Sequence, residues 1–175
     1  MIKIYTEDYE LRIIGIDPGF AIVGWGIIDS DRGRIRPVAY GAITTPAHTP
    51  IEERLLMIKQ DLQTVINKYS PDQMAVEELF FNTNITTGIA VAEARGVIIC
   101  TAHELGVKVS EYTPLQVKQA VVGYGKAEKH QVIAMVTSLL GLKSPPKPDD
   151  TADAIAIAIC HSHSSSSALD RYFNK

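Results

Sequence analysis

The 175-residue sequence has few cysteines and no long apolar run. Cys100 and Cys160 lie in separate apolar stretches without Cys-x-x-Cys spacing, so we expect buried, reduced thiols and neither a disulfide nor a zinc site. No stretch of about 18 uncharged apolar residues occurs, which excludes a transmembrane helix. The start of the chain also lacks the basic and apolar segments of a secretory signal. We therefore expect a cytosolic protein without membrane association.

A surplus of basic residues is also absent. The formal net charge is −3, whereas proteins that bind nucleic acids contact phosphates mainly through lysine and arginine. The charge is unevenly distributed, because residues 115–148 contain one acid, Glu128, and five lysines: Lys118, Lys126, Lys129, Lys143 and Lys147. A solvated helix face also explains such a run. Charge alone therefore leaves nucleic-acid binding open.

The hydrophobic pattern predicts a single α/β domain. Strands are indicated at 11–16, 21–28, 35–44, 73–79 and 107–112, and helices at 51–66, 85–105, 114–122, 127–142 and from 149 onward. The first three strands follow one another closely, which favours antiparallel pairing, and the later ones are joined by crossover helices. The sequence therefore predicts a five-stranded mixed sheet flanked by helices, with residues 11–16 as a central strand. This topology is compatible with a ribonuclease H-like fold.

Four acids lie where these elements begin or end. Asp17 follows the first strand, Glu77 lies in the fourth, and Asp150 and Asp153 are on one face at the start of the last helix. Ligands gather at the carboxyl ends of strands in α/β sheets. A cluster of carboxylates there would suit Mg²⁺ or Mn²⁺. Two such ions, about 3.5–4 Å apart, can activate a water and stabilise the leaving oxygen during phosphodiester hydrolysis.

Each acid also has a purely structural interpretation. Asp17-Pro18-Gly19 is first of all a turn sequence, and Asp150 could cap a helix. Glu77 and Glu78 point to opposite faces of a strand, and spacing does not choose between them. Among the histidines, His161 and His163 lie too far along the last helix to join this cluster, so we expect them to be structural or exposed.

Six segments in order resemble the bacterial RuvC resolvases, which cut Holliday junctions, the four-way DNA junctions of recombination. They read Ile14-Gly-Ile-Asp-Pro-Gly19, Ala75-Val-Glu-Glu-Leu-Phe80, Ala94-Arg-Gly96, Gln116-Val-Lys-Gln-Ala-Val-Val-Gly123, Ala127-Glu-Lys129 and Asp150-Thr-Ala-Asp-Ala154. Their spacing matches the family along residues 11–163. A lone Asp-Pro-Gly would be weak support, whereas six ordered matches over nearly the whole chain are specific.

The resemblance implies a role for each matched position. Asp17, Glu77, Asp150 and Asp153 would be the catalytic, metal-binding acids, which favours Glu77 over Glu78. Phe80, Lys118 and Lys129 would contact DNA, although without the resemblance a phenylalanine here is more often core and Lys129 more often a surface charge. The implied cofactor is Mg²⁺, two ions per site with Mn²⁺ as a substitute. The implied partners are four-way junction DNA, a second copy of the chain, and the branch-migration proteins RuvA and RuvB.

The resemblance also implies a division of the chain and a biological role. Residues 1–10 would be an N-terminal extension, 11–163 the nuclease domain and 164–175 a flexible polar tail. Leu11 stands where related sequences begin with methionine, so we expect the extension to be a mis-assigned start or dispensable. The activity would be symmetric, metal-dependent resolution of Holliday junctions during homologous recombination and DNA repair.

Several alternatives remain at this point. The helix at 85–105, rich in glycine and alanine, is a candidate dimer contact, but tight packing within the domain explains it nearly as well. Arg95 could contact phosphate or pair with Glu93 or Glu104. Other function classes are a YqgF-type nuclease, which has a shorter chain, an actin-like ATPase, which needs two lobes, and a non-catalytic junction-binding protein, which would have lost one or more of the acids.

Overall fold

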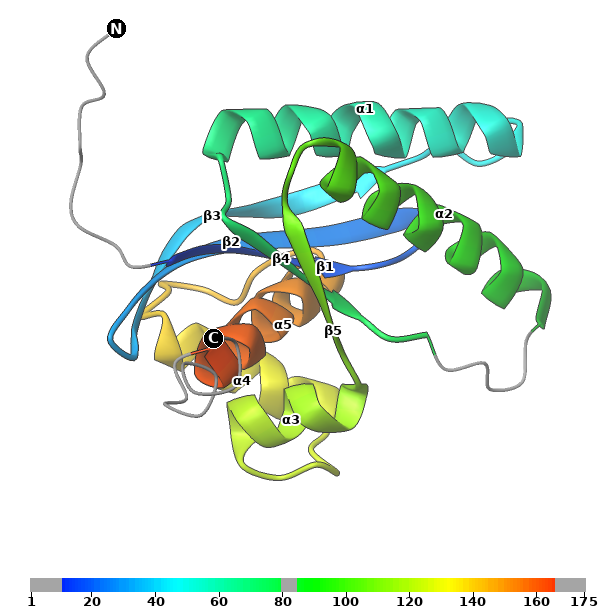
Figure 1. The fold of residues 1–175 in the computed structure, drawn as a ribbon. Coiled ribbons are helices and arrows are strands. Elements are labelled where there is room, and N and C mark those ends of the chain that lie inside the picture. Colours follow the sequence, from blue (N-terminus) through cyan, green and yellow to red (C-terminus); the bar gives the residue numbers. More distant parts are fainter. Residues whose placement is uncertain (1–10, 80–84, 166–175) are drawn as a thin grey trace, which may run out of the picture.

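A single twisted sheet forms the centre of the molecule, with helices on both faces (Figure 1). The structure is a computed structural model and describes residues 11–79 and 85–165. The strands are β1 (Leu11–Asp17), β2 (Ile22–Asp31), β3 (Arg34–Thr44), β4 (Gln73–Glu77) and β5 (Lys108–Tyr112), in the order β3-β2-β1-β4-β5. β1 to β3 pair antiparallel, and β4 runs parallel to both β1 and β5. The predicted mixed sheet with a central first strand is confirmed.

The helices divide between the two faces of this sheet and form a separate core on each (Figure 1). α1 (Ile51–Tyr69) and α2 (Ile85–Glu104) share a core with Ile14, Ile16 and Val76. α3 (Pro114–Val122), α4 (Lys129–Leu139) and α5 (Asp149–Ser165) share a second core with Ile13 and Ala75. Within the described ranges, no helix is long and apolar enough to cross a membrane.

Alternation along β1 decides which face its last residue occupies. Ile14 and Ile16 pack toward α1 and α2, while Ile13 packs on the side of α5. A Cβ added to Gly15 would meet the backbone of α5, which places this residue on the α5 side as well. Because side chains alternate with a period of two, Asp17 projects to the same side as Ile13 and Gly15.

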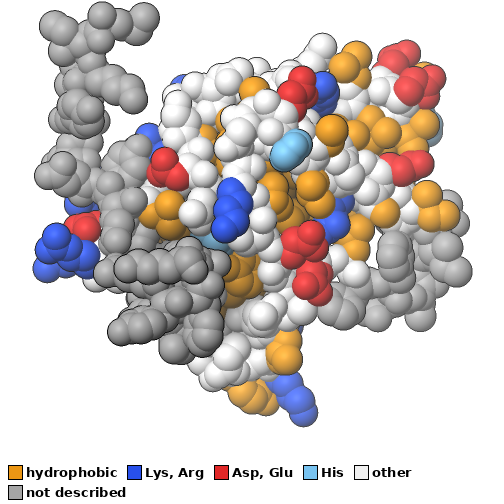
Figure 2. All heavy atoms as spheres, in the orientation of Figure 1, with side chains coloured by type: hydrophobic (Ala, Val, Ile, Leu, Met, Phe, Trp, Pro, Cys, Tyr) orange, Lys and Arg blue, Asp and Glu red, His pale blue; other side chains and the backbone are white. Residues whose placement is uncertain are grey.

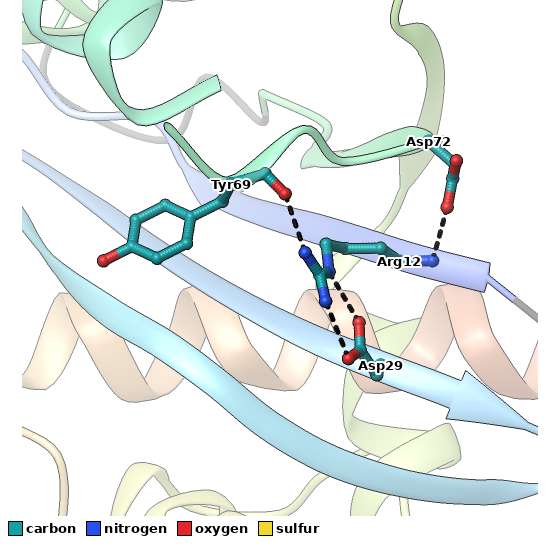
Figure 3. A network of polar contacts seen from close by, with 4 residues as sticks. All are labelled: Arg12, Asp29, Tyr69 and Asp72. Carbon is teal, nitrogen blue, oxygen red and sulfur yellow. Dashed lines mark hydrogen bonds and ion pairs between the residues drawn. The ribbon is translucent and has the colours of Figure 1, made fainter. Parts of the chain in front are cut away.

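A polar network fixes the other end of β1 (Figure 3). The guanidinium of Arg12 donates through Nε and Nη2 to the two carboxylate oxygens of Asp29 on β2, at 2.7 and 2.9 Å, and through Nη1 to the carbonyl of Tyr69, at 2.9 Å. The Arg12 backbone N–H donates to Asp72 at 2.7 Å. These contacts join β1, β2 and the connection between α1 and β4, so they hold the central strands in register.

One of the two predictions of a buried thiol is wrong. Cys100 is exposed, because α2 buries Ala94, Ile98 and Ala102, and a residue two positions after Ile98 lies on the opposite side of a helix. Cys160 is buried as expected.

The helix predicted over 127–142 is shorter than expected. Glu128 is the N-cap of α4 and forms a capping box with Gln131, and Leu140 is the C-cap. Ala127 therefore lies before the helix, in a turn in which its N–H donates to the carbonyl of Tyr124. At the other end of the domain, α5 continues to Ser165, two residues beyond the predicted domain boundary. The predicted extension and the tail from residue 166 onward lie outside the described residues.

Candidate active site

Asp17 and Glu77 end neighbouring parallel strands. The pairing of β1 with β4 runs from Ile13 opposite Gln73 to Ile16 opposite Val76, so the next residues along both strands are Asp17 and Glu77. Val76 belongs to the core under α1 and α2, which directs Glu77 to the opposite side, that of α5. The strand geometry therefore places Glu77, and not Glu78, on the same face as Asp17.

Glycines on β1 and β2 let α5 lie directly against the sheet. A Cβ at Gly24 would be 2.1 Å from the backbone oxygen of Asp150, and one at Gly15 would be 2.0 Å from that of Ala154. Gly24 is also the residue paired with Asp17 across the two strands. The start of α5, which holds Asp150 and Asp153, therefore lies beside Asp17.

Side-chain hydrogen bonding secures the same end of α5. The Thr151 hydroxyl donates to the carbonyl of Gly41 on β3, at 3.2 Å. Farther along the helix, His161 contacts the Tyr112 hydroxyl through Nδ1, at 2.7 Å, and the Gln73 side-chain oxygen through Nε2. His161 is thus a buried structural residue, as expected, and it docks α5 on β4 and β5.

The four acids share one electrostatic environment. Burial, followed by the charges of Glu77, Asp153 and Asp150, raises the pKa of Asp17 from 3.8 to about 8. Burial and the charge of Asp153 also raise the pKa of Glu77. Such mutual repulsion is relieved when a cation or a proton enters the cluster. The structure therefore brings together the four acids that the sequence singled out.

Both predicted lysines lie at the edge of this cluster. The Nζ atom of Lys129, the first residue of α4, is 2.9 Å from a carboxylate oxygen of Asp153. Burial opposes the charged form of Lys129, but the hydrogen bond to Asp153 and the nearby acids together raise its pKa. Lys118 on α3 is close enough for its charge to counteract the rise in the pKa of Glu77. Phe80 lies outside the described residues.

The donor chemistry of the acid cluster fits a hard divalent cation. Carboxylate oxygens are the ligands that Mg²⁺ and Mn²⁺ prefer, and burial together with the neighbouring acids raises the pKa of Asp17, which favours a bound cation or proton. In the part of the chain that is described, no three side chains of His, Cys, Asp or Glu are close enough to hold one ion as they stand. Asp153 instead faces Lys129. Metal binding therefore requires side-chain adjustment.

A groove of about 620 Å³ opens beside the acids. Asp150 forms part of its wall, together with Gly19 and Phe20 of the turn after β1, Arg54 of α1, and Ala90 and Val91 of α2. The Arg54 guanidinium lies 3.7 Å from the centre of the Phe20 ring and donates to the Thr45 hydroxyl at 2.8 Å. The groove is largely apolar, and among its lining residues Asp150 belongs to the acid cluster and Arg54 is a cation held in place by these contacts.

Sequence reasoning missed two features of this site. The glycines under α5 carry a usable signal, since Gly24 and Gly26 are two residues apart in a β-rich run and so share one face. The partner of Arg95 leaves no such signal in the sequence. Arg95 pairs with Glu111 on β5, and not with Glu93 or Glu104 on its own helix. A contact made across the fold leaves no pattern in local spacing.

Comparison with known proteins identifies one family along most of the chain. The family model for the crossover junction endodeoxyribonuclease RuvC matches residues 13–161. The RuvC of Desulfitobacterium hafniense is 58% identical over 146 residues, which are 83% of this chain and 88% of that protein. That of Brevibacillus brevis is 55% identical over 145 residues, 83% of this chain and 87% of that protein.

Solved structures give the same result. Thermus thermophilus RuvC in complex with its Holliday junction substrate superposes with a TM-score of 0.85 at 35% identity, covering 90% of this chain and 96% of that one. The yeast mitochondrial Holliday junction resolvase Ydc2, at 12% identity and a TM-score of 0.65, covers 97% of this chain and 86% of its own and supports the fold alone. The ribonuclease H-like fold is confirmed, and the chain belongs to the RuvC family of crossover junction endodeoxyribonucleases.

Proposed function

We propose that this chain resolves four-way DNA junctions by metal-dependent hydrolysis of one phosphodiester in each of two strands. The main support is the convergence of Asp17, Glu77, Asp150 and Asp153 at one edge of the sheet, in a chain of the RuvC family. A purely structural role for these acids is disfavoured, because burying mutually repelling carboxylates destabilises a fold unless a cation is bound. A junction-binding protein without catalysis would not need them.

Family membership implies dependence on a divalent metal ion, and we infer Mg²⁺, two ions per site, with Mn²⁺ as a substitute. Asp17 and Glu77 would hold such ions from the sheet, and Asp150 and Asp153 from α5. When bound, these ions would supply an activated water and neutralise charge that develops on the phosphate oxygens. Asp153 must first exchange its contact with Lys129 for the ion. Lys129 is then available to a phosphate oxygen of the DNA.

We propose that a single strand of DNA enters the site beside the acids. The groove beside Asp150 has room for individual nucleotides, and its apolar wall accepts bases or sugars. Lys118 and Lys129 lie beside the acids, where phosphates would pass. We propose that these lysines contact the cut strand and that Phe80 stacks on an unpaired base near the crossover. Recognition would then depend on the shape of the branch more than on sequence.

A homodimer matches the two-fold symmetry of the substrate, because each active site makes one nick. We propose α2 as the contact. Its buried side faces the core, and Ile89 on the helix is 53% exposed. Figure 2 shows apolar side chains interspersed with charged ones over the region of α1 and α2. The family resemblance further leads us to expect RuvA and RuvB as partners, to be tested by adding both proteins to the cleavage reaction.

The test of the proposed lysine contacts is a comparison of binding with cutting. Junction affinity is measured in Ca²⁺, and single-turnover cleavage in Mg²⁺, for wild type, Lys118→Met and Lys126→Met. Lys126 is an exposed lysine in the turn before α4 and serves as the matched control. We expect Lys118→Met to slow cleavage about 100-fold, as removal of one stabilising donor does elsewhere, and Lys126→Met to have little effect. Equal effects of the two changes would contradict a specific role for Lys118.

A further inference from the structure

Arg95 joins three elements at the edge of the acid cluster. It extends from α2, and its side chain is only 17% exposed. Its Nε donates to the backbone carbonyl of Glu77, the last residue of β4, at 3.1 Å. Its Nη2 donates to a carboxylate oxygen of Glu111 on β5, at 2.5 Å. One guanidinium therefore ties the ends of two parallel strands to the helix that covers them.

The contact lies where β4 no longer pairs with β1 and is held by β5 alone. β4 ends at this residue, and the next backbone bond in the chain is from the Glu78 N–H to the carbonyl of Tyr112, at 2.9 Å. The carboxylates of Asp17 and Asp153 repel that of Glu77. The bonds to β5 hold one side of this strand end, and on the other side β1 no longer pairs with it, so the repulsion acts where β4 is held on one side only. A carbonyl held by Arg95 fixes the Cα from which the Glu77 side chain extends.

We propose that Arg95 is a positioning residue, which holds the end of β4 so that the Glu77 carboxylate stays within reach of a divalent cation shared with Asp17. This inference rests on the proposed function for the role of the acids. Arg95 acts through the backbone of Glu77 and touches neither metal nor DNA in this arrangement. Two of its nitrogens already bind protein oxygens, so a direct phosphate contact is not its main use.

Arginine is required for this geometry. Its planar guanidinium presents several N–H donors in a fixed arrangement, which lets it bind a carbonyl and a carboxylate at once. A lysine has one nitrogen on a flexible stem and would satisfy the two partners less well. We therefore expect Arg95→Lys to be intermediate between wild type and Arg95→Gln. Glu111→Gln removes the charged partner but keeps the bond to Glu77, so its effect should be the smallest.

The experiment measures metal binding without DNA as well as cleavage. Mn²⁺ binding to the DNA-free protein is followed by electron paramagnetic resonance of the free ion, and junction affinity is measured in Ca²⁺. Outer-shell partners of metal ligands typically contribute about 10–100-fold to metal affinity or activity. We expect Arg95→Gln to weaken Mn²⁺ binding and slow single-turnover cleavage by such a factor, with junction affinity changed less than about twofold. Raising the Mn²⁺ concentration should restore much of its rate.

The control is another ion pair on the same helix. Lys59 on α1 pairs with Glu104 near the end of α2, at 2.9 Å, without contact to β4. Lys59→Gln should leave Mn²⁺ binding and cleavage unchanged. Unchanged Mn²⁺ affinity in Arg95→Lys or folded Arg95→Gln would overturn the proposal, as would an equal loss in Lys59→Gln. A wild-type protein that binds Mn²⁺ but cuts no junction would overturn the proposed function instead, and the Mn²⁺ comparison would still decide the role of Arg95.

Discussion

At the scale of single residues, Asp17 is where fold stability and function oppose each other. Burial of its carboxyl, together with the charges of three other acids, raises its pKa to about 8 in the folded protein. In the unfolded chain it would ionise near 3.8. Between these values the folded state binds more protons than the unfolded state, so the free energy of unfolding falls as the pH rises. The metal-free site is therefore a strained part of the molecule at alkaline pH.

This strain predicts a stabilising substitution. In metal-free buffer at pH 9, Asp17→Asn should raise Tm by about 5 °C, because the amide carries no charge to repel the other acids. At pH 3, where the acid is neutral in both states, the difference should vanish. Calorimetry in a chelating buffer at both pH values measures this, with Asp61→Asn, at an exposed position on α1, as control. A Tm difference that does not change with pH would contradict the account.

Lys129 provides a second test at this scale. Its ammonium group and a divalent cation bind the same carboxylate of Asp153, so they compete. We expect Lys129→Met to bind Mn²⁺ more tightly than wild type in the absence of DNA, yet to cut about 100-fold more slowly because a phosphate contact is lost. Electron paramagnetic resonance and single-turnover cleavage measure the two effects. Weaker Mn²⁺ binding would refute the competition, and wild-type cleavage would refute the phosphate contact.

At the scale of elements, the depth at which α5 lies on the sheet determines where two of the acids are. The helix rests on the glycines of β1 and β2, and the backbone of Asp150 would contact any side chain added at Gly24. Backbone atoms cannot move aside as the end of a flexible side chain can. The distance between the sheet and α5 therefore determines the positions of Asp150 and Asp153.

Gly24→Ala should displace the first turn of α5. The added Cβ would lie 2.1 Å from the Asp150 oxygen, so the helix must shift. Overpacking of this kind lowers the free energy of unfolding by about 1–3 kcal/mol, and misplacement of the acids should slow cleavage about 100-fold. Urea denaturation and a cleavage assay measure both effects.

The control for this substitution is Gly96→Ala on α2. A Cβ there has nothing within 4 Å, so this variant should be as stable as wild type or more stable. If Gly24→Ala were also as stable as wild type, the glycines would not determine how closely α5 lies on the sheet.

The elements themselves were largely predictable from the sequence, since periodicity indicated their order and type. The choice of Glu77 over Glu78 was not, because β4 is buried on both faces and shows no alternation of polar and apolar residues. Only the packing of Val76 under α1 and α2 reveals which way Glu77 points. The contact between Arg95 and Glu111 was hidden for a similar reason, as it joins residues that are neighbours only in the folded sheet.

At the scale of the whole molecule, the proposed function calls for two copies of the chain, one for each strand that is cut. If α2 forms the contact, a charge on its exposed face should separate them. Ile89→Asp should halve the mass measured by light scattering and weaken paired cutting, because burying an unpaired carboxylate at an interface is unfavourable. Leu115→Asp, at a similarly exposed residue of α3, should leave the mass unchanged. Equal masses for Ile89→Asp and wild type would exclude α2 as the main contact.

The most direct test of the central claim is cleavage of a labelled synthetic four-way junction in Mg²⁺, resolved on a denaturing gel beside a linear duplex of the same sequence. The account predicts paired, symmetric nicks in the junction alone. Asp17→Asn should bind the junction and leave it uncut. A wild-type protein that binds the junction but makes no nicks in Mg²⁺ or Mn²⁺ would contradict the catalytic assignment of the four acids.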